Sequence, residues 1–162
     1  MKATGEVLGV GKEFGTALNK AYAAAGVEIN NKEKGIFVTL SDSEKPNFIQ
    51  TVNKYLELGF TLYSTEGTGK FLKTNGIDSV TVGKADDLGQ TSLTIIEDKL
   101  VSLVINTPTY ANEFSDGWKI RRLSHETGVA VVSSVREADA FIEAFLNQNL
   151  VLDDLEVIQD VS

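Results

Sequence analysis

Residues 35–64 read GIFVTLSDSEKPNFIQTVNKYLELGFTLYS, and this pattern sets the architecture of the chain. Residues 35–40 form a short apolar run rich in β-favouring residues, which predicts a strand. Ser43 and Pro46 predict the start of a helix that runs through Tyr55 and stops at Gly59. Residues 60–64 predict a second strand. A strand, a helix and a strand with short connections indicate a right-handed crossover between parallel strands.

The same alternation continues beyond this unit. Further strands are expected at residues 78–82, 100–106 and 129–132, and further helices at residues 67–75, 91–99 and 116–127. The strand at 100–106 is the most hydrophobic, so we expect it to be central. Ser134 and Glu137 form a predicted capping box for a last helix. Its apolar residues repeat at helical spacing and are Ala138, Phe141, Ile142, Phe145 and Leu146.

Five strands that alternate with helices predict the α/β class. The expected fold is a single Rossmann-like domain of three layers, with a five-stranded, mostly parallel sheet covered by helices on both faces. A polar linker at residues 30–35 is the one plausible internal boundary, and it follows a predicted helix at 14–26. We divide the chain into an upstream segment at 1–30, the main domain at 31–150 and an acidic-hydrophobic tail at 151–162.

Composition excludes several classes of function. The chain has 162 residues, 42% of them hydrophobic, which suits one soluble globular domain. No apolar run approaches the ~18 residues of a membrane span. Without cysteine there is no disulfide, zinc–thiolate site or cysteine nucleophile, and a reducing cytoplasm is the expected location. A net charge of −8 argues against nucleic-acid binding.

Polar residues follow each predicted strand, at the edge of a parallel sheet where ligands bind. The most distinctive segment is STEGTGK at residues 64–70. Thr65 and Thr68 offer hydroxyls, Gly67 lets a ligand approach the backbone, and the next helix presents its positive N-terminus, so this segment suits a phosphate. The alternative is that a threonine simply caps the helix. The spacing matches neither a P-loop nor a dinucleotide fingerprint.

Other residues on this edge have two interpretations each. Lys45 and Lys84 are cations that either reach the ligand or stay solvated. Asn106 and Thr107 either bind the ligand or terminate the sheet. Asp116, like several loop carboxylates, is either a candidate general base or a solvent-facing residue. Arg121 and its neighbour Arg122 are expected to pair with carboxylates or to face another protein.

These motifs resemble a known family. The stretches TLSDSEKP, GFTLYSTEGTGKFL, VGKADD, LVINTPT and SDGWKIRR are similar to the C-terminal allosteric domain of the carbamoyl-phosphate synthase large chain, which has the methylglyoxal-synthase-like fold. The opening residues 1–21 resemble the end of the preceding ATP-grasp half. The resemblance therefore implies a regulatory fragment of a longer ligase that serves pyrimidine and arginine biosynthesis.

The resemblance also implies a ligand and its contacts. The fragment would bind a nucleotide monophosphate effector such as UMP or IMP, with no catalytic residue, metal or cofactor of its own. Its partners would be the catalytic domains of the same chain, which use ATP with Mg or Mn, and through them a small glutaminase subunit. The implied effector-binding residues are Lys45, Thr65, Gly67, Thr68, Lys84, Asn106, Thr107 and Asp116, while Pro108 replaces a hydroxyl residue of the family.

Three alternatives follow from the same residues. One is a stand-alone methylglyoxal-synthase-like lyase that acts on a small phosphorylated substrate, but the histidines of that family are missing. Another is the cyclohydrolase half of a purine-synthesis enzyme, for which the chain is too short. The third is a docking module that binds another protein through Trp118 and the tail. Such a module would not bind a nucleotide.

Overall fold

The computed structural model describes residues 34–107 and 115–143. Within these residues the strands are β1 (Gly35–Thr39), β2 (Leu62–Ser64), β3 (Val80–Thr81), β4 (Val101–Asn106) and β5 (Ala130–Val132). The helices are α3 (Lys45–Glu57), α4 (Glu66–Thr74), α5 (Ser92–Glu97) and α6 (Asp116–Thr127), and residues 135–143 are also helical. The expected helix at 14–26, the tail at 151–162, Pro108, Phe145 and Leu146 lie outside the described residues, so the three-segment division stays a prediction.

The five strands form one sheet in the order β3-β2-β1-β4-β5, and every pairing is parallel. This confirms the α/β prediction. The middle strand is β1 rather than the expected segment at 100–106. Still, β4 is an interior strand with all six residues buried, as its hydrophobicity indicates.

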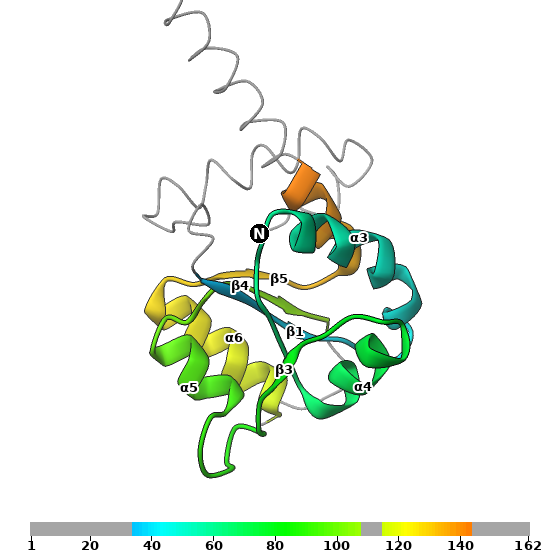
Figure 1. Ribbon diagram of the computed structural model, residues 1–162. Coiled ribbons are helices and arrows are strands. Elements are labelled where there is room, and N and C mark those ends of the chain that lie inside the picture. The colour runs from blue at the N-terminus through cyan, green and yellow to red at the C-terminus, as the bar shows by residue number, and fades with distance from the viewer. Residues whose placement is uncertain (1–33, 108–114, 144–162) are drawn as a thin grey trace, which may run out of the picture.

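Helices cover both faces of the sheet (Figure 1). On one face α3, α4 and residues 135–143 pack on the side chains of Ile36, Val38 and Leu103. On the other face α5 and α6 pack on Phe37 and Val104. Alternate residues of β1 and β4 therefore enter opposite cores, because successive side chains of a strand point to opposite faces. The result is the expected three-layer arrangement.

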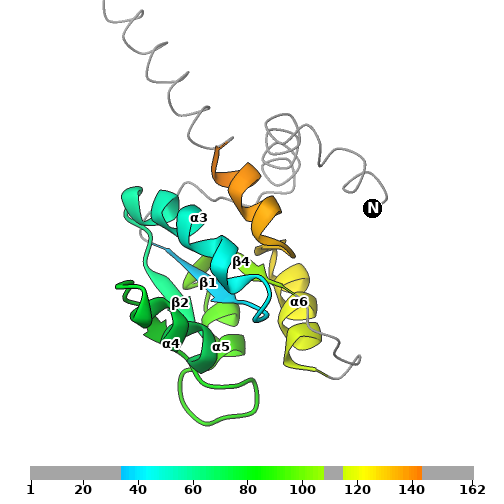
Figure 2. The same ribbon diagram turned by 90° about the vertical axis from the view of Figure 1, so that its right-hand side faces the viewer.

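The helix at residues 135–143 lies beside α3 in both views (Figures 1 and 2). The Tyr55 hydroxyl donates to the Ala138 carbonyl at 2.7 Å, and Lys54 pairs with Asp139 and Glu143, each at 2.7 Å. Burial alone would lower the pKa of Lys54, but its hydrogen bonds to the two carboxylates outweigh burial and raise it. These contacts join the two helices on this face of the sheet.

Two helix starts differ from the prediction. Helix α3 begins at Lys45 after Glu44, without a side-chain cap, because the Ser43 hydroxyl lies 3.3 Å from that of Ser41 instead. At the last helix the Ser134 hydroxyl accepts from the Glu137 N–H as expected, at 3.0 Å. The Glu137 carboxylate, however, accepts from the Ser133 N–H rather than from that of Ser134. Only half of the predicted capping box is present.

Two glycines explain how closely α4 approaches β2 and where α6 ends. A Cβ at Gly69 would come within 2.8 Å of the Ser64 hydroxyl, so only glycine lets α4 approach the end of β2 this closely. Gly128 has a φ of 73° and ends α6 in the left-handed conformation, as its place in the sequence predicts. The chain then enters β5.

Candidate functional site

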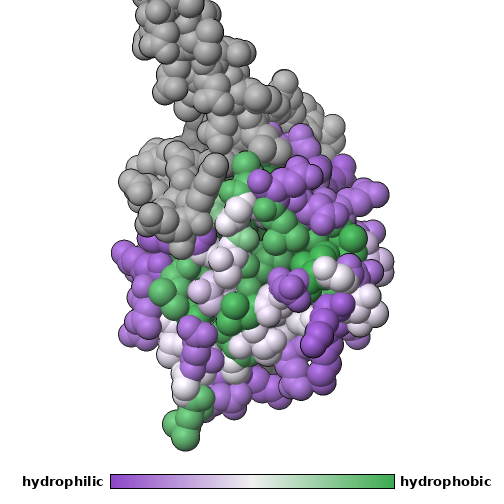
Figure 3. Space-filling model, in the orientation of Figure 1, coloured by the Kyte–Doolittle hydropathy of each residue, from purple (hydrophilic) through white to green (hydrophobic). Residues whose placement is uncertain are grey.

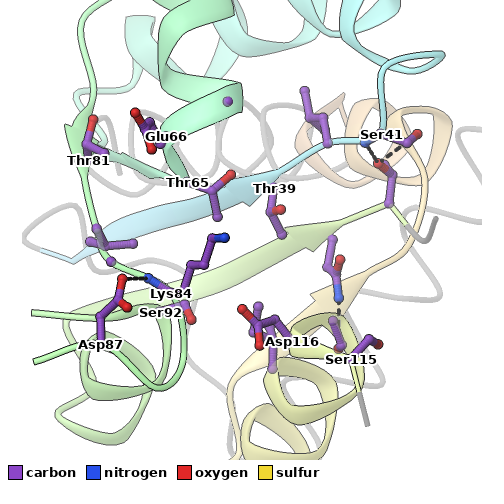
Figure 4. A pocket seen from close by; sticks show the side chains of 18 of the residues that line it. Thr39, Ser41, Thr65, Glu66, Thr81, Lys84, Asp87, Ser92, Ser115 and Asp116 are labelled. Carbon is purple, nitrogen blue, oxygen red and sulfur yellow. Dashed lines mark hydrogen bonds between the residues drawn. The ribbon is translucent and has the colours of Figure 1, made fainter. Parts of the chain in front are cut away.

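A cavity of about 660 Å³ opens at the C-terminal edge of the sheet. Its wall is built from the ends of β1 to β4 and from the first turns of α4 and α6. The lining residues are Thr39, Leu40, Ser41, Thr65, Glu66, Gly67, Thr81, Val82, Gly83, Lys84, Asp87, Ser92, Asn106, Thr107, Ser115, Asp116, Gly117, Ile120 and Arg121. Figure 4 shows them converging from separate segments of the chain. The cavity thus lies where an open parallel sheet binds its ligands.

Six of the eight predicted site residues line this cavity, namely Thr65, Gly67, Lys84, Asn106, Thr107 and Asp116. The other two, Lys45 and Thr68, are not part of the lining. The structure therefore brings most of the predicted set together around one space. Their roles toward a ligand stay predictions.

The first turn of α4 forms one wall. Thr65 occupies the N-cap position, but its hydroxyl makes no capping bond to the backbone and instead lies 3.3 Å from the Thr68 hydroxyl. The simple capping interpretation of Thr65 is therefore wrong. A Cβ built at Gly67 would meet only the Lys45 amine, at 3.9 Å, so the backbone here is open to approach. The unpaired N–H groups of a helix start attract anions.

Thr68 has a structural contact that the sequence did not indicate. Its hydroxyl is buried and accepts a hydrogen bond from the Leu40 N–H at 3.1 Å. Thr107 does the same for the next residue, accepting from the Ser41 N–H at 2.6 Å. Because β1 ends here, these two backbone groups would otherwise lack a partner. Both threonines hold the end of β1 in place.

Lys45 and Lys84 differ in whether their amines are paired with a carboxylate in the described part of the chain. The Lys45 amine is paired with Asp42 at 2.7 Å, which holds the pKa of that exposed carboxyl below its usual range. Lys84 has no ion pair among residues 34–107 and 115–143, and Figure 4 shows its side chain extending into the cavity toward the side of Thr65. The pKa of Glu66 is lowered mainly by a hydrogen bond from Lys70 and further by the charge of Lys84. Of these two lysines, Lys84 is thus the one that lines the cavity.

The segment that carries Lys84 is held at two points. The Asp87 carboxylate accepts from the Lys84 N–H at 2.8 Å, and Asp86 pairs with Lys119 of α6 at 3.2 Å. Beyond them the loop projects from the body of the protein, and its tip is apolar (Figures 1 and 3). The side chain of Leu88 in this loop is fully exposed.

The first turn of α6 forms the opposite wall. The Asn106 amide donates to the Gly117 carbonyl at 3.1 Å, which fixes the turn to the end of β4. The Asp116 carboxylate accepts from the Ala85 N–H at 3.5 Å, which is long for a hydrogen bond. Within the described residues, most of the accepting capacity of Asp116 is therefore unused.

Sequence reasoning missed part of the wall, above all Arg121. A Cβ built at Gly117 would lie 3.4 Å from an Arg121 nitrogen and 3.5 Å from the Asn106 amide nitrogen, so these groups are neighbours. The expected pairing of Arg121 with a carboxylate is not found in the described part of the chain. Residues 116, 117, 120 and 121 share a helix face, so their spacing was a usable signal. Arg122, by contrast, pairs with Glu126 at 3.0 Å as expected.

The described residues support neither a metal site nor a membrane-spanning helix. No group of three or more His, Asp or Glu side chains that could hold a metal ion occurs in residues 34–107 and 115–143. In the same residues no helix is both long and apolar enough to cross a membrane.

The fold and the cavity define a class of protein: an α/β domain with a cavity at the C-terminal edge of a parallel sheet. The profile of the MGS-like domain family matches residues 47–133, and the chain belongs to this family. The resemblance read from the sequence is therefore confirmed.

Three similar proteins are named as carbamoyl phosphate synthase large chains or their C-terminal sections. The chain is 37% identical over 148 residues to a carbamoyl phosphate synthase large chain of Lachnoclostridium phytofermentans, which covers 91% of this chain and 14% of the relative. It is 38% identical over 145 residues to the C-terminal section of such a large chain from Aquifex aeolicus, covering 89% of this chain and 27% of the relative. A C-terminal section from Methanocaldococcus jannaschii is 35% identical and is covered to 23%. The chain thus spans about a quarter or less of these relatives.

Proposed function

We propose that this chain is a regulatory domain that binds a nucleoside monophosphate in the cavity at the edge of the sheet. The observation that carries the proposal is the open first turn of α4, with Thr65 and Gly67, in one cavity with the Lys84 amine, which has no ion pair in the described part of the chain. Backbone N–H groups, a hydroxyl and one cation form a suitable set of donors for a phosphate.

The opposite wall supports the nucleoside part of the proposal. Asp116 offers carboxylate oxygens that accept hydrogen bonds, and the hydroxyls of a ribose are donors. A ligand with an anion at one end and hydroxyls at the other matches this distribution of charge. The cavity volume of about 660 Å³ lies in the usual range of small-molecule sites. From the family resemblance we take UMP and IMP as the first candidates.

The names of the relatives suggest the larger context. We infer that the domain regulates a carbamoyl phosphate synthase, in the cytoplasm, and has no synthase activity by itself. Its partners would be the catalytic regions of the large chain and, through them, a glutaminase subunit. ATP and Mg or Mn would be bound by those regions. Regulation needs an effector that binds two states of the whole enzyme unequally, so the isolated domain should bind without regulating.

The alternative of a stand-alone lyase is not favoured. Proton transfer on a phosphorylated substrate needs an acid and a base in the cavity. The lining has the carboxylates of Glu66, Asp87 and Asp116, but the one histidine, His125, is not part of it. Asp87 also already accepts from the Lys84 backbone. The relatives reported above are named as synthase large chains and not as lyases.

Calorimetric titration with UMP and with IMP tests the proposal. The wild type should bind one of them with one-to-one stoichiometry, and the double variant Thr65→Ala/Lys84→Ala should lose this binding. A matched control is Lys73→Ala/Thr74→Ala, which removes the same two residue types from the far end of α4. Binding that survives in the first variant would contradict the phosphate site. No heat with either nucleotide at millimolar concentration would contradict the proposed function.

A further inference from the structure

Two buried serine hydroxyls have no hydrogen-bond partner in the part of the chain that the structure describes. They belong to Ser92 and Ser102, residues that are 1% and 4% exposed. A buried hydroxyl without a partner is destabilising by roughly 1–3 kcal/mol. Unpaired groups of this kind are rare in folded proteins, so each asks for a reason.

The two serines occupy different places. Ser92 is the first residue of α5 and lines the cavity, where Figure 4 shows it near Lys84 and Asp87. Its backbone N–H donates to the Gly83 carbonyl at 3.1 Å and so ties α5 to the segment that carries Lys84. Ser102 lies near the start of β4, at the far end of the strand from Asn106, and is not part of the cavity wall.

Ser92 also differs from the other hydroxyls around it. The Thr91 hydroxyl accepts from the Thr94 N–H at 3.2 Å, and the Ser115 hydroxyl accepts from the Trp118 N–H at 3.3 Å. The hydroxyl of Thr107 serves the end of β1. Thr81 on the wall is exposed and can bind water. Ser92 is thus both buried and unpaired, and the cavity is the open space beside it.

The neighbours of Ser92 indicate what it would bind. The Lys84 amine only donates hydrogen bonds, and the Asp87 carboxylate already accepts from the Lys84 N–H at 2.8 Å. A ligand atom beside Lys84 must therefore be an acceptor. A rotation about the Cα–Cβ bond can turn the Ser92 hydroxyl toward such an atom.

We propose that Ser92 is a binding residue of this cavity, whose hydroxyl donates a hydrogen bond to an acceptor oxygen of the phosphorylated ligand next to Lys84. This inference rests on the proposed function, since it needs a ligand in the cavity. It adds a contact from α5, an element in which the sequence analysis predicts no site residue. The Ser92 hydroxyl, which has no hydrogen-bond partner within the described residues, gains one on binding.

Calorimetry on the full chain tests the inference, with UMP, IMP and inorganic phosphate as probes. Ser92→Ala should bind the preferred probe about five to tenfold more weakly, the effect of one lost hydrogen bond. Ser102→Ala is the matched control and should bind as the wild type does. Neither variant should lower the free energy of unfolding in urea, because each removes an unpaired polar group. Ser92→Cys, which has only a weak S–H donor, should repeat the loss of affinity.

The outcomes separate the two proposals. If the wild type binds a probe and Ser92→Ala binds it equally well, the inference is wrong and the proposed function stands. An equal loss of affinity in Ser102→Ala would also overturn the inference, because the effect would not be specific to the cavity. If the wild type binds none of the probes, the proposed function and the inference are both wrong.

Discussion

The hydroxyl of Thr68 accepts a hydrogen bond from the backbone N–H of Leu40 at 3.1 Å, and both residues are buried. This bond joins α4 to the end of β1, two segments that are 28 residues apart in the chain. Thr65, three residues earlier, has a hydroxyl that makes no bond to the backbone. The two threonines of one motif therefore have separable roles, one toward the fold and the other toward the cavity.

Replacing each threonine by valine should separate these roles. Thr68→Val leaves the Leu40 N–H buried without a partner, so the free energy of unfolding should fall by about 1–3 kcal/mol. Thr65→Val should change it by less than about 0.5 kcal/mol and should instead weaken UMP or IMP binding. Urea unfolding and calorimetry on both variants provide the two measurements. A stable Thr68→Val that has lost nucleotide binding would instead mean that Thr68 is a ligand contact.

Two glycines of the same motif should respond differently to alanine. Gly69→Ala brings a Cβ within 2.8 Å of the Ser64 hydroxyl and should destabilise the fold by about 1–3 kcal/mol. Gly67→Ala meets nothing closer than the Lys45 amine at 3.9 Å, and alanine is the better helix former. We expect it to stabilise the fold by up to about 1 kcal/mol. Thermal unfolding of both variants checks this. Equal losses of stability in the two variants would show that the close approach of Gly69 to Ser64 does not require glycine.

Much of the fold follows from the sequence, because the same local pattern of apolar runs between polar segments recurs along the chain. Short apolar runs bounded by Gly and polar residues predicted all five strands, and Gly128 marked the end of α6. The order of strands is less accessible. The apolar run of β4 shows only that both its faces are covered. Which interior strand lies in the middle depends on how the crossovers are arranged.

The candidate site was predictable as a place and less so as a set of contacts. Polar residues after strands marked the correct edge and gave six residues of the wall. The sequence cannot show that the Thr68 hydroxyl accepts a hydrogen bond from the Leu40 N–H, because that bond depends on how α4 packs against β1. Nor can it show that the buried Ser92 hydroxyl has no hydrogen-bond partner among residues 34–107 and 115–143.

High pH should destabilise the protein through Tyr55. Burial raises the pKa of its hydroxyl well above the ordinary value, with a smaller contribution from the charge of Asp139. Above about pH 10 the unfolded chain releases this proton while the folded chain keeps it. The free energy of unfolding therefore falls as pH rises, by up to about 1.4 kcal/mol per pH unit for this group. Lys54, whose pKa is also raised, adds to the loss in the same direction.

Tyr55→Phe removes one of these two contributions. The variant loses the hydrogen bond to the Ala138 carbonyl and should be about 1 kcal/mol less stable at pH 7. Its stability should then fall less steeply than that of the wild type between pH 9.5 and about 11. Urea unfolding at several pH values compares the slopes. If the free energy of unfolding falls equally steeply with pH in the two proteins, Tyr55 does not cause the loss of stability at high pH.

Arg121 should contribute to ligand binding, although the sequence predicts pairing with a carboxylate or contact with another protein. Together with Lys84 it is a cation on the cavity wall, and it has no ion pair among residues 34–107 and 115–143. Arg121→Ala should weaken the binding of UMP or IMP about tenfold, the effect of losing one charged donor. The neighbouring Arg122 pairs with Glu126 and lies over the ring of Trp118, outside the cavity. Arg122→Ala is therefore the control and should leave the affinity unchanged.

The dependence on salt gives this last prediction a second readout. A ligand held by two cations loses affinity with rising ionic strength, and removing one cation should make the loss shallower. Calorimetry at several salt concentrations should therefore give a shallower dependence for Arg121→Ala than for Arg122→Ala. If Arg121→Ala binds as tightly as the wild type and with the same salt dependence, the guanidinium does not act on the ligand. Lys84, on the segment between β3 and α5, would then account for the charge recognition alone.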